Sequence, residues 1–310
     1  MSRRPKAYAD RPAPPDGLVI VDKPGGWTSH DVVGKMRRLV GTRRVGHAGT
    51  LDPMATGVLV LGVERATRLL GHLTLTQKEY EGTIRLGQAT VTDDAEGEVT
   101  ESAPAERVAA VAEAAVRAGI GALTGEIMQV PSSVSAIKVD GVRSYARVRS
   151  GDEVKLQPRP ITIHEFDLRE IRRGEGVLDL DVRVLCSSGT YIRALARDLG
   201  EGLGVGGHLT ALRRTRVGPY TLAESAPLAE LAARAEAGQP VPVLPMAQAA
   251  DAAFPRYDAD AEEAEAIAHG RPLPARGLGP GPIAVFSPEG AFLALVEEQG
   301  RRCKPLAVFV

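Results

Sequence analysis

Apolar residues occur along this chain both in continuous runs and in alternation with polar residues, and both patterns predict strands. Residues 17–22 form a short apolar run, and residues 58–63 form another directly after a glycine-rich loop. Both runs are typical of buried strands. Residues 79–86 and 177–185 alternate apolar and polar side chains, which predicts strands with one covered face. A further strand is predicted over 208–220.

Other stretches repeat apolar residues at helical spacing. Thr28 or Ser29 can cap a helix that runs to about Val40 and has one apolar and one basic face. The Ala-rich residues 105–118 predict one surface helix. Residues 189–203 predict a helix with a single apolar stripe.

Composition changes after about Leu222. A helix rich in Ala and Glu is predicted over 224–237, and a Pro-rich linker follows. Beyond the linker we expect a short helix ending at Gly270 and strands near 282–286, 291–297 and 304–309.

Strands and helices do not alternate regularly, so we expect an α+β fold with a mixed, mostly antiparallel sheet flanked by helices. A small β-rich module is expected at the C-terminal end. The predicted organisation is a disordered basic tail over 1–16, a main domain over 17–237 and the C-terminal module over 246–310.

The composition is that of an ordinary globular protein, with 310 residues, of which 44% are hydrophobic and 25% charged. Two cysteines are too few for a disulfide framework or a metal cluster, which favours a reducing, cytoplasmic location. The basic N-terminal residues lack the apolar stretch of a signal peptide, and no apolar run predicts a membrane span.

Charge is unevenly distributed, although the formal net charge is only −1. Residues 1–80 and 131–220 are basic, whereas 81–130 and 221–310 are acidic. A polyanion would therefore be attracted to patches of the surface. Solvated faces of many proteins show the same segregation, so charge alone does not identify a nucleic-acid partner.

One carboxylate, Asp52, stands in a loop punctuated by glycines within the segment 46–62. Glycine permits positive φ and close approach of another backbone, and Pro53 restricts Asp52 to extended geometry. A surface turn can use the same residues. Here the carboxylate lies between His47 and a buried strand, which favours a functional role.

Tyr80 and Arg193 are further candidates. Tyr80 lies on the predicted strand 79–86, where a half-buried structural tyrosine is the alternative interpretation. Arg193 lies in the first turn of the predicted helix 189–203, off its apolar stripe. A cation there opposes the helix dipole, so we expect a carboxylate to hold it; an ordinary surface arginine is the alternative.

Two other candidate motifs, a glycine pattern and the histidines, lack the surroundings that their functions require. The pattern G-x-G-x-x-G at Gly202, Gly204 and Gly207 follows a helix instead of a strand, which argues against a dinucleotide site and an oxidoreductase. The six histidines show no metal-ligand spacing. We expect neither a metal nor a cofactor.

The segments that carry Asp52, Tyr80 and Arg193, taken together, resemble those of bacterial tRNA pseudouridine synthases of the TruB family. The similarity runs over about 17–220. It comprises the segments 21–26, 46–62, 78–87, 131–138, 188–193 and 212–214. The C-terminal segment resembles a PUA-like RNA-binding module more weakly.

The resemblance implies the pseudouridine synthase fold and the conversion of uridine 55 in the T arm of tRNA to pseudouridine. By this resemblance Asp52 matches the catalytic aspartate, Tyr80 the tyrosine that stacks on the target base, and Arg193 the arginine paired with the aspartate. His47 matches a histidine that helps to flip the nucleotide. Further matches are Lys23, Tyr191 and Leu212 in the base pocket, and Arg68, Asp94 and Lys138 on the RNA side.

The chemistry of Asp52 stays open at this point. Its ionised carboxylate can attack C1′ of the ribose or C6 of the base, or can take a proton from C2′. We expect residues 132–151 to grip the T arm. We also expect the protein to be a monomer and to have no membrane partner. An RNA chaperone or tRNA-binding module without turnover is the alternative function.

Overall fold

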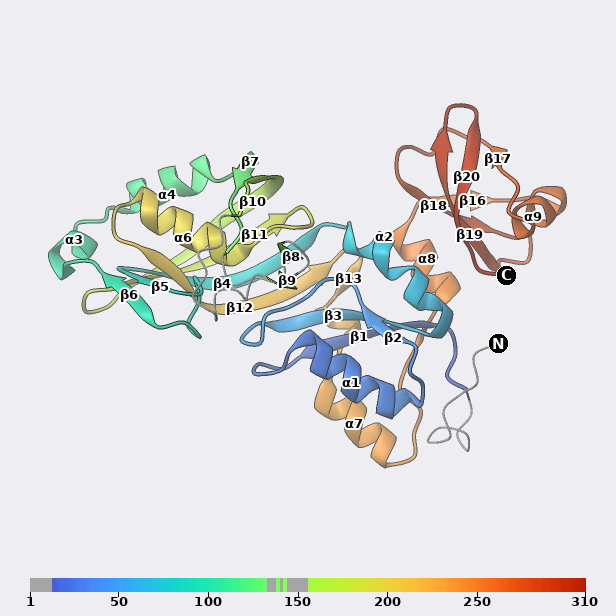
Figure 1. Ribbon diagram of the computed structural model, residues 1–310, viewed down its shortest axis with the longest axis horizontal. Coiled ribbons are helices and arrows are strands. Elements are labelled where there is room, and N and C mark those ends of the chain that lie inside the picture. The colour runs from blue at the N-terminus through green and yellow to red at the C-terminus, as the bar shows by residue number, and fades with distance from the viewer. Residues whose placement is uncertain (1–12, 133–137, 140–141, 144–155) are drawn as a thin grey trace. The chain divides into compact units, whose positions relative to one another are not determined.

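The computed structural model describes residues 13–132, 138–139, 142–143 and 156–310. The chain forms two compact units, which are described separately (Figure 1). The first comprises Met1–Asp52, Val58–Leu75 and Val217–Val310, and the second comprises Pro53–Gly57 and Thr76–Arg216.

The first unit contains the apolar runs predicted as strands. β1 (Gly17–Lys23) lies between β14 (Ala226–Pro227), which runs parallel to it, and β3 (Thr56–Val63). β15 (Leu244–Pro245) pairs with the start of β1, and β2 (Val45–His47) pairs antiparallel with β3. Nearly every residue of β1 and β3 is buried, as the continuous apolar runs predicted.

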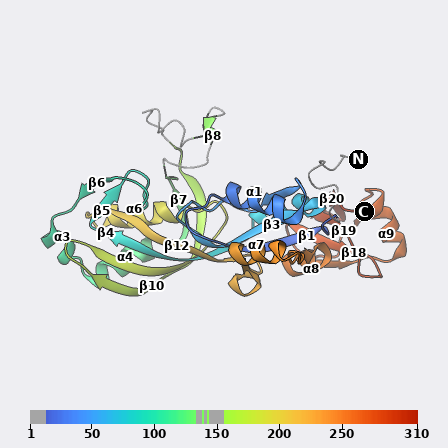
Figure 2. The ribbon, with the colours of Figure 1, turned by 90° about the horizontal axis from the view of Figure 1, so that it is seen from below.

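Two helices lie side by side on one face of β1 and β3: α1 (Ser29–Val40) and α7 (Leu228–Glu236) (Figure 2). The N-cap of α1 is Thr28, whose hydroxyl accepts a hydrogen bond from the backbone N–H of Asp31 while the Asp31 carboxylate accepts one from Thr28 N. This capping box confirms the predicted helix start. Met36 and its apolar neighbours pack between the helices and the strands.

The C-terminal residues form a five-stranded sheet in the order β16 (Arg256–Asp258), β18 (Pro282–Phe286), β19 (Phe292–Gln299), β20 (Arg302–Val308) and β17 (Leu273–Pro274). The short helix α9 (Ala261–Ala268) packs against it. The predicted short helix and three strands are thereby confirmed.

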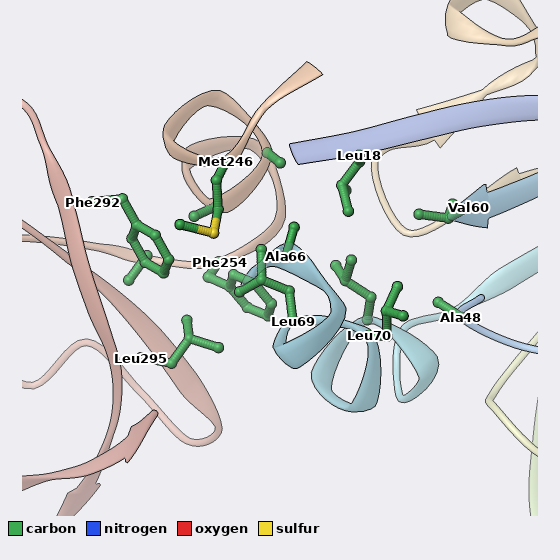
Figure 3. Packing of buried hydrophobic residues seen from close by; sticks show 14 of the residues in the cluster. Leu18, Ala48, Val60, Ala66, Leu69, Leu70, Met246, Phe254, Phe292 and Leu295 are labelled. Carbon is green, nitrogen blue, oxygen red and sulfur yellow. The ribbon is translucent and has the colours of Figure 1, made fainter. Parts of the chain in front are cut away.

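A second apolar core joins this C-terminal sheet to the rest of the first unit (Figure 3). Phe292 and Leu295 of β19 lie on one side of it, and Leu18 of β1 lies on the other. Between them lie Leu69 and Leu70, which follow the 3-10 helix η2 (Glu64–Arg68) and open α2 (Leu70–Thr74). The helix α8 (Met246–Ala253), which the sequence analysis did not predict, also contributes to this core.

The second unit is built on the strand order β12 (Gly207–Val217), β4 (Lys78–Leu86), β11 (Leu178–Cys186), β10 (Arg159–Arg173) and β7 (Gly125–Gln129). The pairs of β4 with β11, β11 with β10 and β10 with β7 are antiparallel. Thr56 and Gly57, which open β3, pair in parallel with Arg213 and Arg214 of β12. The sheet strands are therefore mixed and mostly antiparallel, as predicted.

Gly57 is required at that pairing. Its φ is +100°, and a Cβ atom there would stand 2.2 Å from the carbonyl oxygen of Arg214. Any other residue would push β3 away from β12. The close pairing of β3 with β12 thus explains why a glycine stands at position 57, after the loop of Asp52.

Helices α4 (Glu113–Ala122) and α6 (Ile192–Gly202) cover one face of the second unit's sheet (Figure 1). The predicted single helix over 105–118 is wrong, because the chain forms α3 (Ala105–Ala109) and α4 with a break between them. Val108, Val111 and Val116 are all buried. In one continuous helix Val116 would point about 140° away from Val111, so the break allows all three to reach the core.

The remaining elements are short. The predicted acidic segment after β4 contains the hairpin of β5 (Gln88–Thr90) and β6 (Val99–Ser102). The other pieces are β8 (Lys138–Val139) paired with β9 (Val142–Arg143), β13 (Tyr220–Thr221) and η3 (Leu222–Glu224). Within the described part of the chain, no helix has the length and apolar character needed to cross a membrane.

Candidate active site

The loop that carries Asp52 is held at two points within the first unit. Ser29, the first residue of α1, is 2% exposed, and its hydroxyl bridges the backbone of Leu51. The hydroxyl accepts a hydrogen bond from Leu51 N (2.8 Å) and donates one to Leu51 O (3.2 Å). At the start of the loop Ala48 N donates to the carbonyl of Val60. The half-buried Asp52 therefore follows a residue whose backbone is fixed.

The same unit contains Lys23 and His47. Lys23 ends β1 and is 0% exposed, and its ammonium donates to the carbonyls of Pro24 (2.9 Å) and Trp27 (2.6 Å). It thereby closes the turn that leads into α1. His47 ends β2 opposite Leu61 of β3 and is half-buried. A lysine buried this completely is uncommon and is expected to have a specific role.

Tyr80 and Leu212 share one face of the second unit's sheet. Tyr80 lies on β4 opposite Val184 of β11 and is 7% exposed. Gly82 lies two residues further along β4 and therefore on the same face. A Cβ atom on Gly82 would stand 3.5 Å from Leu212 Cδ1, so the Leu212 side chain covers this glycine. Tyr80 and Leu212 therefore lie on the same face of the sheet, on either side of Gly82.

This face also buries two cations, to which the sequence analysis assigned no role. Lys78 lies two residues before Tyr80, and Arg214 lies two residues after Leu212. Both are buried. Burial, together with the charge of Arg214, lowers the pKa of Lys78 to about 8.

Arg193 is held by a carboxylate, as its position in the first turn of α6 led us to expect, whereas the pairing with Asp52 that the resemblance implies stays a prediction. The carboxylate is Asp94, with Nη1 and Oδ2 3.3 Å apart and both side chains almost fully buried. Nη1 also donates to the carbonyl of Thr92 at 2.7 Å. Asp94 was predicted on the RNA side of the site, and its buried carboxylate here anchors Arg193; an RNA contact by Asp94 stays a prediction.

Tyr191 precedes α6 as its N-cap residue and is held through its backbone by Gln129, the last residue of β7. Gln129 Nε2 donates to Tyr191 O at 3.0 Å, and Gln129 Oε1 accepts from Tyr191 N at 2.9 Å. Gln129 was not among the residues predicted from the sequence. The isolated glutamine had no periodic pattern or motif that would have singled it out.

The two remaining RNA-side candidates lie elsewhere. Arg68 ends η2 in the first unit, donates from Nη1 to the carbonyl of Val308 at 2.5 Å and lies over the Phe309 ring, 4.8 Å from its centroid. Its guanidinium is exposed, so a phosphate contact stays a prediction. Lys138 opens β8, and most of the predicted gripping segment 132–151 lies outside the described residues.

Comparison with known proteins decides the family. A family model described as the N-terminal domain of TruB family pseudouridylate synthases matches residues 37–192. Models for a tRNA pseudouridylate synthase B C-terminal domain and a tRNA pseudouridine synthase II C-terminus match 193–244 and 254–310. The chain belongs to the TruB family of pseudouridylate synthases.

Relatives support this over nearly the whole chain. The tRNA pseudouridine synthase B of Streptomyces griseus is 62% identical over 300 residues, which cover 95% of this chain and 97% of the relative. The protein of the same name from an Arthrobacter strain is 61% identical over 304 residues, covering 94% and 96%. The resemblance stated from the motifs is confirmed, and the chain is an isomerase of this family.

Solved structures show the same fold. A Cbf5–Nop10–Gar1 complex contains a chain that is 26% identical with a TM-score of 0.71, covering 95% of this chain and 85% of the other. A chain in an H/ACA ribonucleoprotein bound to a substrate RNA containing 2′-deoxyuridine is 25% identical with a TM-score of 0.69 at the same coverage. The predicted pseudouridine synthase fold is thereby confirmed.

Proposed function

We propose that this chain converts uridine 55 in the T arm of tRNA to pseudouridine, with Asp52 as its catalytic carboxylate. The observation that carries the proposal is the match over 95% of the chain to relatives named tRNA pseudouridine synthase B. The pinned loop around Asp52 supports the choice of carboxylate, because a group that attacks one carbon must be held within near-attack distance.

The reaction is an isomerisation. The N1–C1′ bond breaks, the uracil turns, and a C5–C1′ bond forms; C5 loses its hydrogen and N1 gains one. An ionised Asp52 can begin this by attacking C1′ or C6, or by removing the C2′ proton. A guanidinium such as that of Arg193 favours the charged form of a carboxylate that it binds. The two parallel N–H donors of the guanidinium also orient the carboxylate.

The target base must leave its stack before it can react, which costs a few kcal/mol. We propose that Tyr80 offsets much of this cost by stacking on the base, since base–aromatic stacking contributes about 1–3 kcal/mol. Leu212, which shares the sheet face of Tyr80, and Tyr191 complete the proposed base pocket. Lys23 is proposed to line the same pocket, and His47 is proposed to help flip the nucleotide.

RNA recognition is proposed to use further parts of the chain. Arg68 and Lys138 would contact phosphates, the segment 132–151 would grip the T arm, and the C-terminal module would bind RNA. The likeness to a chain from a ribonucleoprotein bound to a substrate RNA supports an RNA substrate. A monomeric state, a cytoplasmic location and the domain boundaries at 17–237 and 246–310 stay predictions from the sequence.

The test is tritium release from tRNA labelled at uracil C5. The wild type should release tritium from unmodified tRNA, and a transcript with cytidine in place of uridine 55 should release none. Asp52→Asn should bind tRNA but release nothing, because the amide is neither a nucleophile nor a base. Tight binding without release by the wild type would instead establish the non-catalytic RNA-binding alternative.

A further inference from the structure

The side-chain amide of Gln129 both donates to and accepts from one residue of the proposed site. The amide is 2% exposed, and its donor and acceptor both bind the backbone of Tyr191, at 3.0 and 2.9 Å. The two bonds hold the N–H and the C=O of Tyr191, which belong to the two peptide groups on either side of its Cα, and so fix the backbone from which the tyrosine side chain leaves. Because the two residues are 62 positions apart, this contact is purely tertiary.

Tyr191 occupies the N-cap position of α6, where a tyrosine is not one of the preferred residues. It is the N-cap of α6, with φ −103° and ψ 106°, and its side chain makes no capping hydrogen bond. Ser, Thr, Asp and Asn are preferred there, because their side-chain oxygens accept from free N–H groups of the first turn. A residue that breaks a local rule is expected where function requires its side chain.

A second side chain near the start of α6, that of Arg197, is also bound by residues outside the helix. Arg197 Nη2 donates to the carbonyl of Val130 at 2.8 Å, and Nη1 pairs with Asp93 at 3.2 Å. Gln129, the last residue of β7, and Val130, which follows it, therefore both bind α6 or its cap. This arrangement fixes where the Tyr191 side chain leaves the backbone, independently of the ion pair that holds Arg193.

We propose that Gln129 is a positioning residue for the isomerisation and acts through Tyr191. The inference rests on the proposed function, in which Tyr191 lines the base pocket. Gln129 does not touch the reacting atoms. It holds the tyrosine in the orientation that the flipped base requires, so its loss lowers kcat and leaves the KM for tRNA unchanged.

Gln129→Met tests this with an apolar side chain of similar length. We expect kcat for tritium release to fall about ten- to hundred-fold, the size of effect that a misplacement of about 1 Å can cause. The matched control is Thr124→Val, which removes a side-chain hydrogen bond to Ile120 O just before the other end of β7. It should leave kcat unchanged. An unchanged kcat in folded Gln129→Met would overturn the inference.

Gln129→Glu provides a second test that does not depend on the stability of the methionine variant. A protonated carboxyl has one acceptor and one donor, as the amide has, whereas the ionised form cannot donate to Tyr191 O. Burial favours the protonated form. The variant's kcat relative to wild type should therefore rise as the pH falls. A ratio that does not vary with pH would contradict the role of the donated bond.

A double-mutant cycle separates positioning from general structural support. If Gln129 acts through Tyr191, Gln129→Met should cost much less in a Tyr191→Ala background than in the wild type, because coupled residues are non-additive. The same fold-loss in both backgrounds would overturn the inference. If the wild type itself releases no tritium, it is the proposed function that fails; an active wild type with an unaffected Gln129→Met overturns only this inference.

Discussion

The two units hold their candidate site residues by different forces. In the first unit Ala48, which opens the loop of Asp52, packs into an apolar core, and the hydroxyl of Ser29 fixes the backbone of Leu51. In the second unit Arg193 is held by a buried ion pair with Asp94, and Tyr191 by the buried amide of Gln129.

This difference sets what each unit tolerates. Apolar packing is non-directional, so its loss costs stability in proportion to the cavity that it leaves. Buried polar contacts have defined geometry, so changing one atom type can disturb orientation even when the fold survives. Truncation in the first unit's core should therefore reduce stability, and conservative polar changes in the second should reduce turnover.

The largest expected effect is on stability. Phe292 contacts the rings of Phe286 and Phe309, with centroids 5.7 and 4.9 Å apart, in the core that joins the C-terminal sheet to β1. Phe292→Ala should lower the free energy of unfolding by about 3–5 kcal/mol, measured by urea denaturation. Turnover per folded molecule should not change. Leu75→Ala, at a residue 68% exposed, is the control and should change stability little.

Arg193→Lys should have the next largest effect, and on turnover. Lysine keeps the charge beside Asp94 but loses the planar set of donors that binds a carboxylate and the Thr92 carbonyl together. We expect kcat to fall about a hundred-fold, the scale of loss from a misplaced catalytic group. Arg117→Lys, in an exposed ion pair with Glu113, should leave kcat and stability unchanged. A stability loss without a kcat loss would contradict the comparison.

Ser29→Ala should have the smallest of these effects and tests the hydroxyl that fixes Leu51, the residue before Asp52. Removing the bridging hydroxyl leaves Leu51 N–H without this acceptor, at a cost of about 1–3 kcal/mol, and should lower kcat. Its neighbour provides a matched control. Thr28→Ala removes the cap of the same helix and costs about 1 kcal/mol, but should leave kcat unchanged. Equal kcat values in the two variants would mean that Ser29 does not position Asp52.

The sequence predicted elements well where one period continued over the whole element. The capped helix α1 and the alternating strand β11 follow their predictions closely. β10 was missed although it has 15 residues. Register shifts near Ile163 and Leu168 displace its apolar side chains from a strict period of two, so no alternating pattern was visible.

The candidate site residues could be named one by one because their motifs are local. Glycine and proline spacing drew attention to Asp52, and the helix dipole implied a carboxylate partner for Arg193. The resemblance implied Asp52 as that partner, and nothing in the sequence indicated the buried Asp94 that holds Arg193, because Asp94 and Arg193 lie in different elements. Gln129 was missed for the same reason, since its partner lies 62 positions away.

The sequence by itself thus determined the family, the class of fold and most of the strands and helices, because motifs, caps and periodicity depend on neighbouring residues. Tertiary structure alone decided that Ser29 holds Leu51, that Asp94 holds Arg193 and that Gln129 holds Tyr191. These contacts depend on which buried donor meets which acceptor once the chain has folded. Burial makes each such pairing necessary, but local sequence does not determine the partner.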